Sequence, residues 1–398
     1  MTPRTDFHPS GTGLSAPLPD KITRRSALRS LGTFALGLAA AGCLPQVRTA
    51  ARTSRDPLPP RPLVPVDVSA DRVIRTVVGL RPFRRTGFLI RADRFDEKTI
   101  VHNYGHGGCG VTLSWGSAEL AVEEAVRAGQ NRYAVIGCGA VGLATALLLQ
   151  RRGAEVTIYA KDLPPRTTSN IAGATWYPSF IIDPQRRTPA FETLFERVAR
   201  LSHRAFQDLL GPRHGVRYIE QYWLGDEPHR FNREREIIGD LFPLTRELGR
   251  REHPFDAPWA IRDATMIIEP PIYLHALVQD FRLAGGRIVV RDFSSREEIL
   301  GLDERVILNC TGLGAKALFG DEDLTPIKGQ LIVLLPQPEI DYVMGQGGLY
   351  MFPRTDGILL GGTFEGGVWD LEPDPEAFQR VLAGHDRIFA RMRRPQAA

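Results

Sequence analysis

The sequence predicts a two-domain α/β fold, and three observations point to it. The chain has 398 residues, of which 43% are hydrophobic and 24% charged. That composition is ordinary for a globular protein and excludes collagen-like, disordered and coiled-coil chains. The length suffices for about two domains that each bury a core. In mid-chain, a short apolar strand, a glycine-rich turn and a helical stretch follow one another, as in a β-α-β unit.

The β-α-β unit is expected as a strand at 132–136, a helix at 143–151 and a second strand at 155–159. Its turn carries the pattern G-x-G-x-x-G at Gly137, Gly139 and Gly142. The first glycine permits the tight turn, the second lets a pyrophosphate approach, and the third lets helix and strand pack closely. The helix N-terminus then offers free N–H groups to phosphates. The pattern predicts a Rossmann-like dinucleotide site; the alternative is a glycine-rich turn in another α/β fold.

The acidic residue that binds ribose in such sites is displaced here. Ala160 stands at its usual position, and Asp162 follows two residues later. The loop by itself therefore leaves flavin and nicotinamide cofactors open.

The N-terminal 72 residues are predicted to contain a signal peptide followed by a linker. Residues 1–43 place basic residues before the apolar stretch 31–41, which is typical of a signal peptide and too short for a membrane anchor. The pair Arg24-Arg25 resembles a twin-arginine export signal. Cys43 follows Ala-Ala-Gly as in a bacterial lipoprotein, although ordinary cleavage after Ala41 stays open. We therefore expect export to the periplasm, or lipid anchoring at the bacterial cell envelope; the alternative is a disordered basic N-terminus.

Residues 44–72 contain six prolines and few apolar residues, which predicts an extended linker. The net charge of +4 comes from the first 72 residues, so the remainder has no basic footprint for nucleic acid. The four cysteines form no CxxC pair, so neither a metal site nor a disulfide framework is indicated. No apolar run reaches the ~18 residues of a spanning helix.

One long motif identifies a family. Residues 100–110 read Ile-Val-His-Asn-Tyr-Gly-His-Gly-Gly-Cys-Gly, and this stretch resembles the signature of the D-amino-acid oxidase family of flavoproteins. Further similar segments lie at 79–82, 159–178, 308–312, 329–332, 350–353 and 359–362. The resemblance covers residues 73–398 and implies FAD as the cofactor. It implies oxidative deamination of a D-amino acid by hydride transfer to flavin, giving a 2-oxo acid, ammonia and hydrogen peroxide.

Two other functions stay open beside this one. The enzyme would be an amine or amino-acid dehydrogenase if it passed electrons to a carrier instead of oxygen. The chain would be a non-catalytic flavin-binding exported protein if the site had lost its activity. The partners expected are a small D-amino acid and an electron acceptor, with membrane contact only through Cys43.

The order of the motifs is unusual, because the family begins with the dinucleotide loop and ends with the motifs found here at 79–82 and 102–110. We therefore predict a circular permutant, in which a helix at 117–128 joins the first strand through residues 129–131. The FAD-binding domain is expected at 86–180 and 265–325. A smaller α+β substrate domain with a mixed or antiparallel sheet is expected at 73–85, 181–264 and 326–398, with helices at 189–210 and 375–392. Residues 392–398 should lie near residues 71–76.

The resemblance implies three residues at the substrate. Arg81 matches the arginine that binds the substrate carboxylate, for which a planar guanidinium is well suited. Tyr350 matches a tyrosine whose hydroxyl helps to hold that carboxylate. The main-chain carbonyl near Gly108 would accept from the substrate amine. The alternatives are a surface arginine in a cluster with Arg84 and Arg85, and a core aromatic at position 350.

The cofactor-binding residues implied by the resemblance come from five segments. They are Gly137, Gly139 and Gly142; Asp162; Thr167, Thr168 and Ser169; Thr311 and Gly312; and Gly107, Gly108, Val111 and Thr112. His102 and His106 are expected to have structural roles, and no metal site is expected.

Three residues depart from the family pattern. Lys161 replaces an acidic residue near the adenosine, Gln346 replaces a second pocket tyrosine, and Cys109 replaces a tyrosine beside the flavin. The arginines around Arg81 leave an acidic substrate possible. The side-chain preference, the electron acceptor and the oligomeric state stay open.

Overall fold

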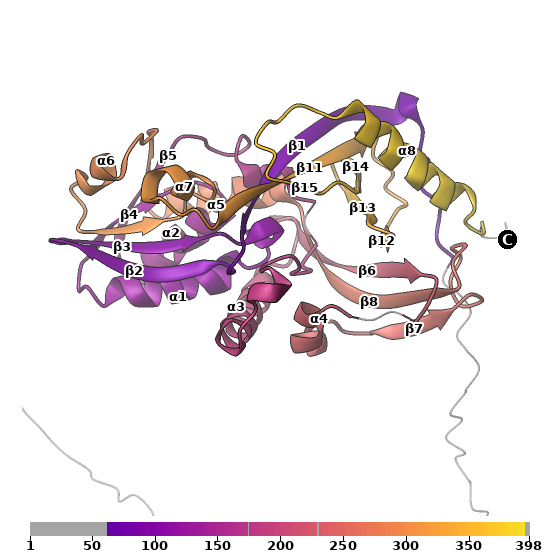
Figure 1. The fold of residues 1–398 in the computed structure, drawn as a ribbon, viewed down its shortest axis with the longest axis horizontal. Helices are drawn as coiled ribbons and strands as arrows, with labels where there is room; N and C mark the ends of the chain where they lie inside the picture. Colours follow the sequence, from indigo (N-terminus) through magenta and orange to yellow (C-terminus); the bar gives the residue numbers. More distant parts are fainter. Residues whose placement is uncertain (1–61, 174, 229–230, 395–398) are drawn as a thin grey trace, which may run out of the picture. The chain divides into compact units, whose positions relative to one another are not determined.

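The computed structural model describes residues 62–173, 175–228 and 231–394, and these residues form two β-sheets with flanking helices (Figure 1). The signal peptide, Cys43 and linker residues 44–61 lie outside the described residues. Among the described residues, no helix is long and apolar enough to cross a membrane.

The first sheet has six strands, and all of them lie within 86–180 and 265–325, the ranges predicted for the FAD-binding domain. Their order is β2 (Leu89–Phe95), β3 (Lys98–Tyr104), β10 (Val306–Asn309), β4 (Arg132–Ile136), β5 (Glu155–Ala160) and β9 (Arg287–Val290). The strands from β3 to β9 are parallel, and β2 is antiparallel to β3. Helices cover the sheet, as buried parallel strands require. They are α1 (Ser114–Val126), α2 (Ala140–Arg151), α5 (Pro270–Leu283), α6 (Arg296–Leu300) and α7 (Gly314–Phe319).

The unit β4-α2-β5 confirms the fold class that the glycine pattern predicts. Helix α2 begins at Ala140, three residues before the expected start, because Gly139 is already its N-cap. The Leu143 amide donates to the Gly139 carbonyl over 2.9 Å. The glycine loop is therefore the first turn of the helix, which brings the helix N-terminus directly to the strand end.

The second sheet is mixed, with nine strands. Its order is β1 (Val73–Arg84), β11 (Leu324–Leu334), β14 (Gly357–Gly361), β13 (Leu349–Arg354), β12 (Tyr342–Gln346), β6 (Val216–Gly225), β8 (Trp259–Ile268) and β7 (Arg246–Gly249), with β15 (Glu365–Gly366) beside β11. Only the pair β12–β6 is parallel among its pairings in the described chain. Helix α8 (Pro375–Ala390) covers β13, β14 and β11 (Figure 1). The short helix α4 (Arg233–Ile237) precedes β7.

Helix α3 (Pro189–Asp208) forms where it is expected, but it packs against the other layer. Thr188 caps it, accepting from the Phe191 amide, and a proline occupies its first turn. Its Ser202 hydroxyl accepts from the Gly116 amide of α1 over 2.8 Å. The apolar face of α3 therefore adds to the core of the first sheet, although its residues fall in the range predicted for the substrate domain.

The structure corrects the C-terminal end of the predicted linker. Leu63, Val66 and Val68 are buried in the core under α8, and the Tyr342 hydroxyl donates to the Val64 carbonyl over 2.8 Å. Because these apolar residues alternate with prolines, the sequence gives no helix or strand pattern that would predict their burial. The same hydroxyl lies 3.8 Å from the Met392 sulfur. Met392 and Val64 thus share a contact with Tyr342, so the end of the described chain lies near a residue ahead of the predicted range 71–76. Residues 395–398 lie outside the described residues.

Candidate functional site

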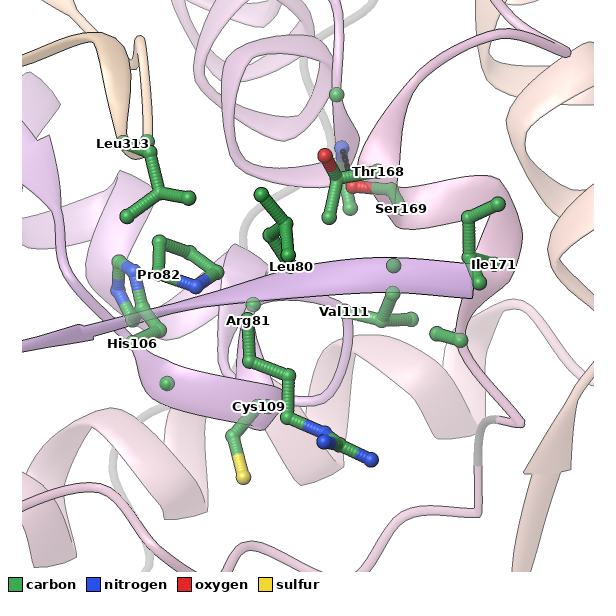
Figure 2. Close-up of a pocket in the computed structure, with 18 of the residues that line it drawn as sticks. Leu80, Arg81, Pro82, His106, Cys109, Val111, Thr168, Ser169, Ile171 and Leu313 are labelled. Atoms are coloured by element: carbon green, nitrogen blue, oxygen red, sulfur yellow. Dashed lines mark hydrogen bonds between the residues drawn. The ribbon is translucent and has the colours of Figure 1, made fainter. Parts of the chain in front are cut away.

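A cavity of about 1180 Å³ is lined by residues of both sheets (Figure 2). Ligand pockets of roughly 300–1,000 Å³ hold drug-sized molecules, so this cavity has room for a large ligand. Every predicted site residue lines it except Gly142. Gly142 acts through packing, because a Cβ there would lie 2.1 Å from the Gly137 carbonyl oxygen.

One end of the cavity is the glycine loop. Gly137 has φ of +111°, and a Cβ there would lie 2.5 Å from the Cys310 carbonyl oxygen. Only glycine fits this backbone without strain. The Ser169 hydroxyl accepts from the Ala140 amide over 3.0 Å, which fixes the run 167–169 beside the helix N-terminus. The loop and the hydroxyl run predicted for the phosphates are therefore neighbours.

The carboxyl ends of β5 and β9 supply the charged lining of this end. Asp162 lines the cavity there, together with Lys161, Arg166, Arg291 and Asp292. The Lys161 ammonium pairs with the Asp292 carboxylate over 3.2 Å. The cation that replaces a family acid is thus balanced by a carboxylate from the next strand.

The histidines of the long motif hold the loops around the cavity. His102 is buried, with its Nδ1 3.0 Å from the Asn309 side-chain amide, whose oxygen accepts from Thr311. Burial lowers the pKa of His102. His106 stacks on Phe88, with ring centroids 5.0 Å apart, and full burial lowers its pKa to about 3. The Nε2 of His102 also lies 3.3 Å from the Asp93 carboxylate, which opposes the effect of burial on the His102 pKa without reversing it.

At the other end the structure brings Arg81, Tyr350 and Gly108 together. The Arg81 Nη2 donates to the Tyr350 hydroxyl over 3.2 Å. A Cβ on Gly108 would lie 3.2 Å from the Arg81 Cδ. Figure 2 shows that Arg81 projects from β1 on one side, whereas Leu80 and Pro82 project on the other, as strand alternation dictates.

The basic cluster around Arg81 is not part of the cavity. Arg84 pairs with Asp321 over 2.9 Å, and Arg85 pairs with Asp323 over 3.3 Å. Neither arginine lines the cavity. The argument for an acidic substrate that rests on these arginines is therefore removed.

Two cavity neighbours have structural roles. The Cys109 sulfur accepts from the Ser179 amide over 3.2 Å and lies 2.9 Å from its carbonyl, and burial raises the pKa of this thiol to about 11. Burial therefore disfavours the thiolate form of Cys109. Trp176 is fully buried and donates to the Thr112 carbonyl over 3.1 Å, which holds the segment predicted at the flavin edge.

Sequence reasoning missed four aromatic residues that line the substrate end: Tyr177, Phe180, Trp223 and Phe364. Phe364 lies two residues beyond the predicted segment 359–362, in the connection between β14 and β15, so no strand alternation points to it. Phe180 reaches the cavity from the connection that precedes α3, and Trp223 reaches it from β6. Gln346, the last residue of β12, also lines it. Within the described residues, no group of His, Cys, Asp and Glu is arranged to hold a metal ion.

Comparison with known proteins shows which proteins this chain resembles. The chain matches the model of FAD-dependent oxidoreductases over residues 60–124 and 132–397. It is 34% identical to the D-amino-acid oxidase of Rubrobacter xylanophilus over 277 residues, which is 66% of this chain and 78% of that protein. It is 28% identical to the D-amino acid oxidase of Dugesia ryukyuensis over 265 residues, covering 64% and 77% of the two chains. It is 26% identical to the human D-aspartate oxidase over 260 residues, covering 63% and 74%.

Proposed function

This chain belongs to the family of FAD-dependent oxidoreductases, and from that premise we propose that it oxidises a D-amino acid to the 2-oxo acid and ammonia, with oxygen reduced to hydrogen peroxide. One observation carries the proposal. Arg81 and Tyr350, joined through their side chains, line the same cavity as the dinucleotide loop. The relatives named D-amino-acid oxidase support the same substrate class.

The residues present fit FAD. The cradle at Gly137 and Gly142 has no space for a Cβ, so backbone surrounds the site where a pyrophosphate is expected. Asp162, Thr167, Thr168 and Ser169 would hold the adenosine and phosphate end, with Thr311 and Gly312 beside them. Gly107, Gly108, Val111 and Thr112 would present their backbone to the ring end. When bound, FAD would accept the hydride that leaves the substrate α-carbon.

The protein's own residues position the substrate. Arg81 would bind the carboxylate through its guanidinium edge, and the Tyr350 hydroxyl would donate to the same group. The main-chain carbonyl of Gly108 would accept from the amine and so fix which face of the α-carbon is presented. If the amine arrives neutral, no side chain needs to take up a proton before oxidation. Orientation is then the main contribution of this chain to catalysis.

An anaerobic absorption spectrum of the purified protein tests the function. D-alanine, D-proline and D-aspartate are added in turn, and bleaching of the oxidised flavin band near ~450 nm reports substrate oxidation. Readmitted air restores the band rapidly in an oxidase and slowly in a dehydrogenase. A flavin spectrum that no D-amino acid bleaches would contradict the proposal.

We further propose that the chain is a circular permutant of its family. The family model matches in two segments, 60–124 and 132–397, which meet near the expected junction at 129–131. The Tyr342 hydroxyl contacts both Val64 and Met392, so the two ends of the described chain share one core. This proximity supports a change of connectivity without a change of fold.

We also propose that the protein is exported and acts in the periplasm or on the cell envelope. The Arg24-Arg25 pair supports a twin-arginine route, which carries folded proteins and so suits a cofactor inserted before export. Cys43 supports a lipid anchor. Replacing Arg24 and Arg25 with Lys should retain the precursor in the cytoplasm. Cys43→Ser should release the product from the membrane fraction, and mass spectrometry of the mature N-terminus distinguishes the two cleavage sites.

A further inference from the structure

Phe180 is an exposed aromatic residue in a strained backbone conformation. Its φ is +53°, although a bulky side chain disfavours the left-handed region. Its side chain is 59% exposed, so burial does not offset the strain. The backbone is fixed on both sides: both main-chain polar groups of Ser179 contact the Cys109 sulfur, and the Asp183 amide donates to the Arg85 carbonyl. Strain that surrounding structure maintains is characteristic of functional sites.

The Phe180 ring belongs to a stack that ends on Arg81. Its centroid lies 4.7 Å from that of Phe364, whose side chain is 46% exposed. The Arg81 Cζ lies 4.3 Å from the centroid of the Phe364 ring. All three residues line the cavity. Phe364 therefore covers one face of the guanidinium, whose Nη1 donates to the Lys328 and Thr363 carbonyls over 3.4 Å and whose Nη2 donates to the Tyr350 hydroxyl. Phe180 extends the aromatic surface outward from that point.

Charge is scarce at this end of the cavity. The other charged residues in its described lining follow β5 and β9, at the dinucleotide end. The nearby polar and aromatic lining includes Tyr177, Trp223 and Gln346 beside Tyr350. A substrate whose carboxylate is bound at Arg81 would therefore find no second cation for an acidic side chain.

We propose that Phe180 and Phe364 determine the side-chain specificity of the enzyme by forming an aromatic surface that contacts the substrate side chain. This inference rests on the proposed oxidation of D-amino acids. It names an apolar, and above all an aromatic, side chain as the preferred one. Phe364 has a second effect, because its ring also positions Arg81 for the carboxylate that every substrate carries.

The experiment compares kcat/KM for D-phenylalanine, D-alanine and D-aspartate in the purified full chain. Phe180→Ala should lower kcat/KM for D-phenylalanine about tenfold and leave D-alanine within about twofold, since aromatic contacts are of that strength. Phe364→Leu should lower kcat/KM for both, through a higher KM, because Arg81 loses its stacking partner. Phe180→Gly should lose the same discrimination while its melting temperature stays equal or rises, since glycine relieves the strain.

Leu244→Ala is the matched control. Leu244 is 68% exposed, has φ of +62° and lies outside the cavity lining. Its replacement should therefore leave kcat/KM unchanged for both D-phenylalanine and D-alanine. Equal losses for D-phenylalanine and D-alanine in Phe180→Ala, or a wild-type preference for D-aspartate, would overturn this inference alone. A wild-type flavin that no D-amino acid reduces would overturn the proposed function itself, so the two failures are distinguishable.

Discussion

At the scale of single residues, Arg81 makes the sharpest prediction. A lysine there keeps the charge and loses the planar fork that holds a carboxylate in two bonds. We expect Arg81→Lys to raise KM for a D-amino acid by roughly 100-fold, the effect of losing a charge-assisted bond of about 3 kcal/mol. The flavin absorbance should be retained, because the glycine cradle lies at the other end of the cavity. Steady-state kinetics measure KM, and the absorbance ratio of flavin to protein measures the bound flavin.

Arg85→Lys is the control for this prediction. Arg85 is a charged neighbour in the sequence, but it pairs with Asp323 and lies outside the cavity lining. Its replacement should leave KM unchanged. Unaltered kinetics in Arg81→Lys would remove Arg81 from the substrate site.

The site residues differ in how far the sequence reveals them. Arg81 and Tyr350 are found because each lies in a motif, and the structure joins them although 269 positions separate them. Phe180 carries no such signal, because its strain and its stack on Phe364 depend on tertiary contacts. The sequence also suggests a free basic cluster at Arg84, which Asp321 neutralises in the folded chain. In each case the role of the residue depends on a contact with a residue that is distant in the sequence.

At the scale of elements, the junction of β4 and α2 depends on the absence of a side chain at Gly142. A Cβ there would lie 2.1 Å from the Gly137 carbonyl oxygen, so Gly142→Ala must move the helix away from the strand. We expect this variant to lose most of its FAD at purification, read from the absorbance ratio of flavin to protein. Gly239→Ala, where the added Cβ meets nothing within 4 Å, should retain it. Full flavin occupancy in Gly142→Ala would contradict the assignment of the cradle.

Helix α8 supports the strand that carries Tyr350. The Nε2 of the buried His385 lies 3.1 Å from the Tyr350 carbonyl oxygen, and its Nδ1 lies 2.8 Å from the Val381 carbonyl oxygen. A neutral ring has one N–H and donates to one of the two. We expect His385→Ala to raise KM several-fold by loosening Tyr350, with kcat changed less.

A double-mutant cycle tests whether His385 acts through Tyr350. In the Tyr350→Phe background, His385→Ala should add little, because the hydroxyl that it positions is already absent. The exposed Arg387→Ala on the same helix is the control and should leave KM unchanged. Additive losses in the cycle would show a general effect on folding instead.

Elements with a strong periodic pattern are predicted well, and those set by packing are not. Strand β4 has the predicted bounds, and α3 differs by two residues at its end. The residues of α3 fall in the range assigned to the substrate domain, and its amphipathic pattern does not show that α1 is its packing partner. The prolines at 62 and 65 favour a linker, whereas Leu63 and Val66 are buried in the core that α8 shares.

At the scale of the whole molecule, buried histidines predict how stability depends on pH. Burial lowers the pKa of five histidines from 6.5, namely His102, His106, His203, His253 and His385. Below that value the unfolded chain binds protons that the folded chain excludes, so stability falls as pH falls. Each such proton contributes at most about 1.4 kcal/mol per pH unit. Asp263, whose pKa burial raises to about 6, partly offsets this trend.

Guanidinium unfolding at pH 7.5, 6.5 and 5.5 measures the effect. The midpoint should fall with pH, and His106→Gln should make the dependence shallower. Replacement of the exposed His275 with Gln should not alter it. A midpoint that is constant or rises toward pH 5.5 would contradict the prediction.

The connectivity of the whole chain gives the last prediction. Val64 and Met392 contact the same Tyr342 hydroxyl, so a short glycine-serine linker from Arg394 to Leu63 spans the gap without distorting either end. A chain reopened at residue 129 would then begin with β4 and end with α1, the order of the family. Because the sheets keep all their pairings, we expect this rearranged protein to bind FAD and to unfold within a few degrees of the natural chain in a thermal melt. Its matched control carries the same linker but is reopened between Gly137 and Cys138, inside the glycine loop, and should lose FAD because the turn from β4 into α2 is broken. Loss of FAD in both proteins would show that the natural order is required, and would end the interpretation of this chain as a permutant with an unchanged fold.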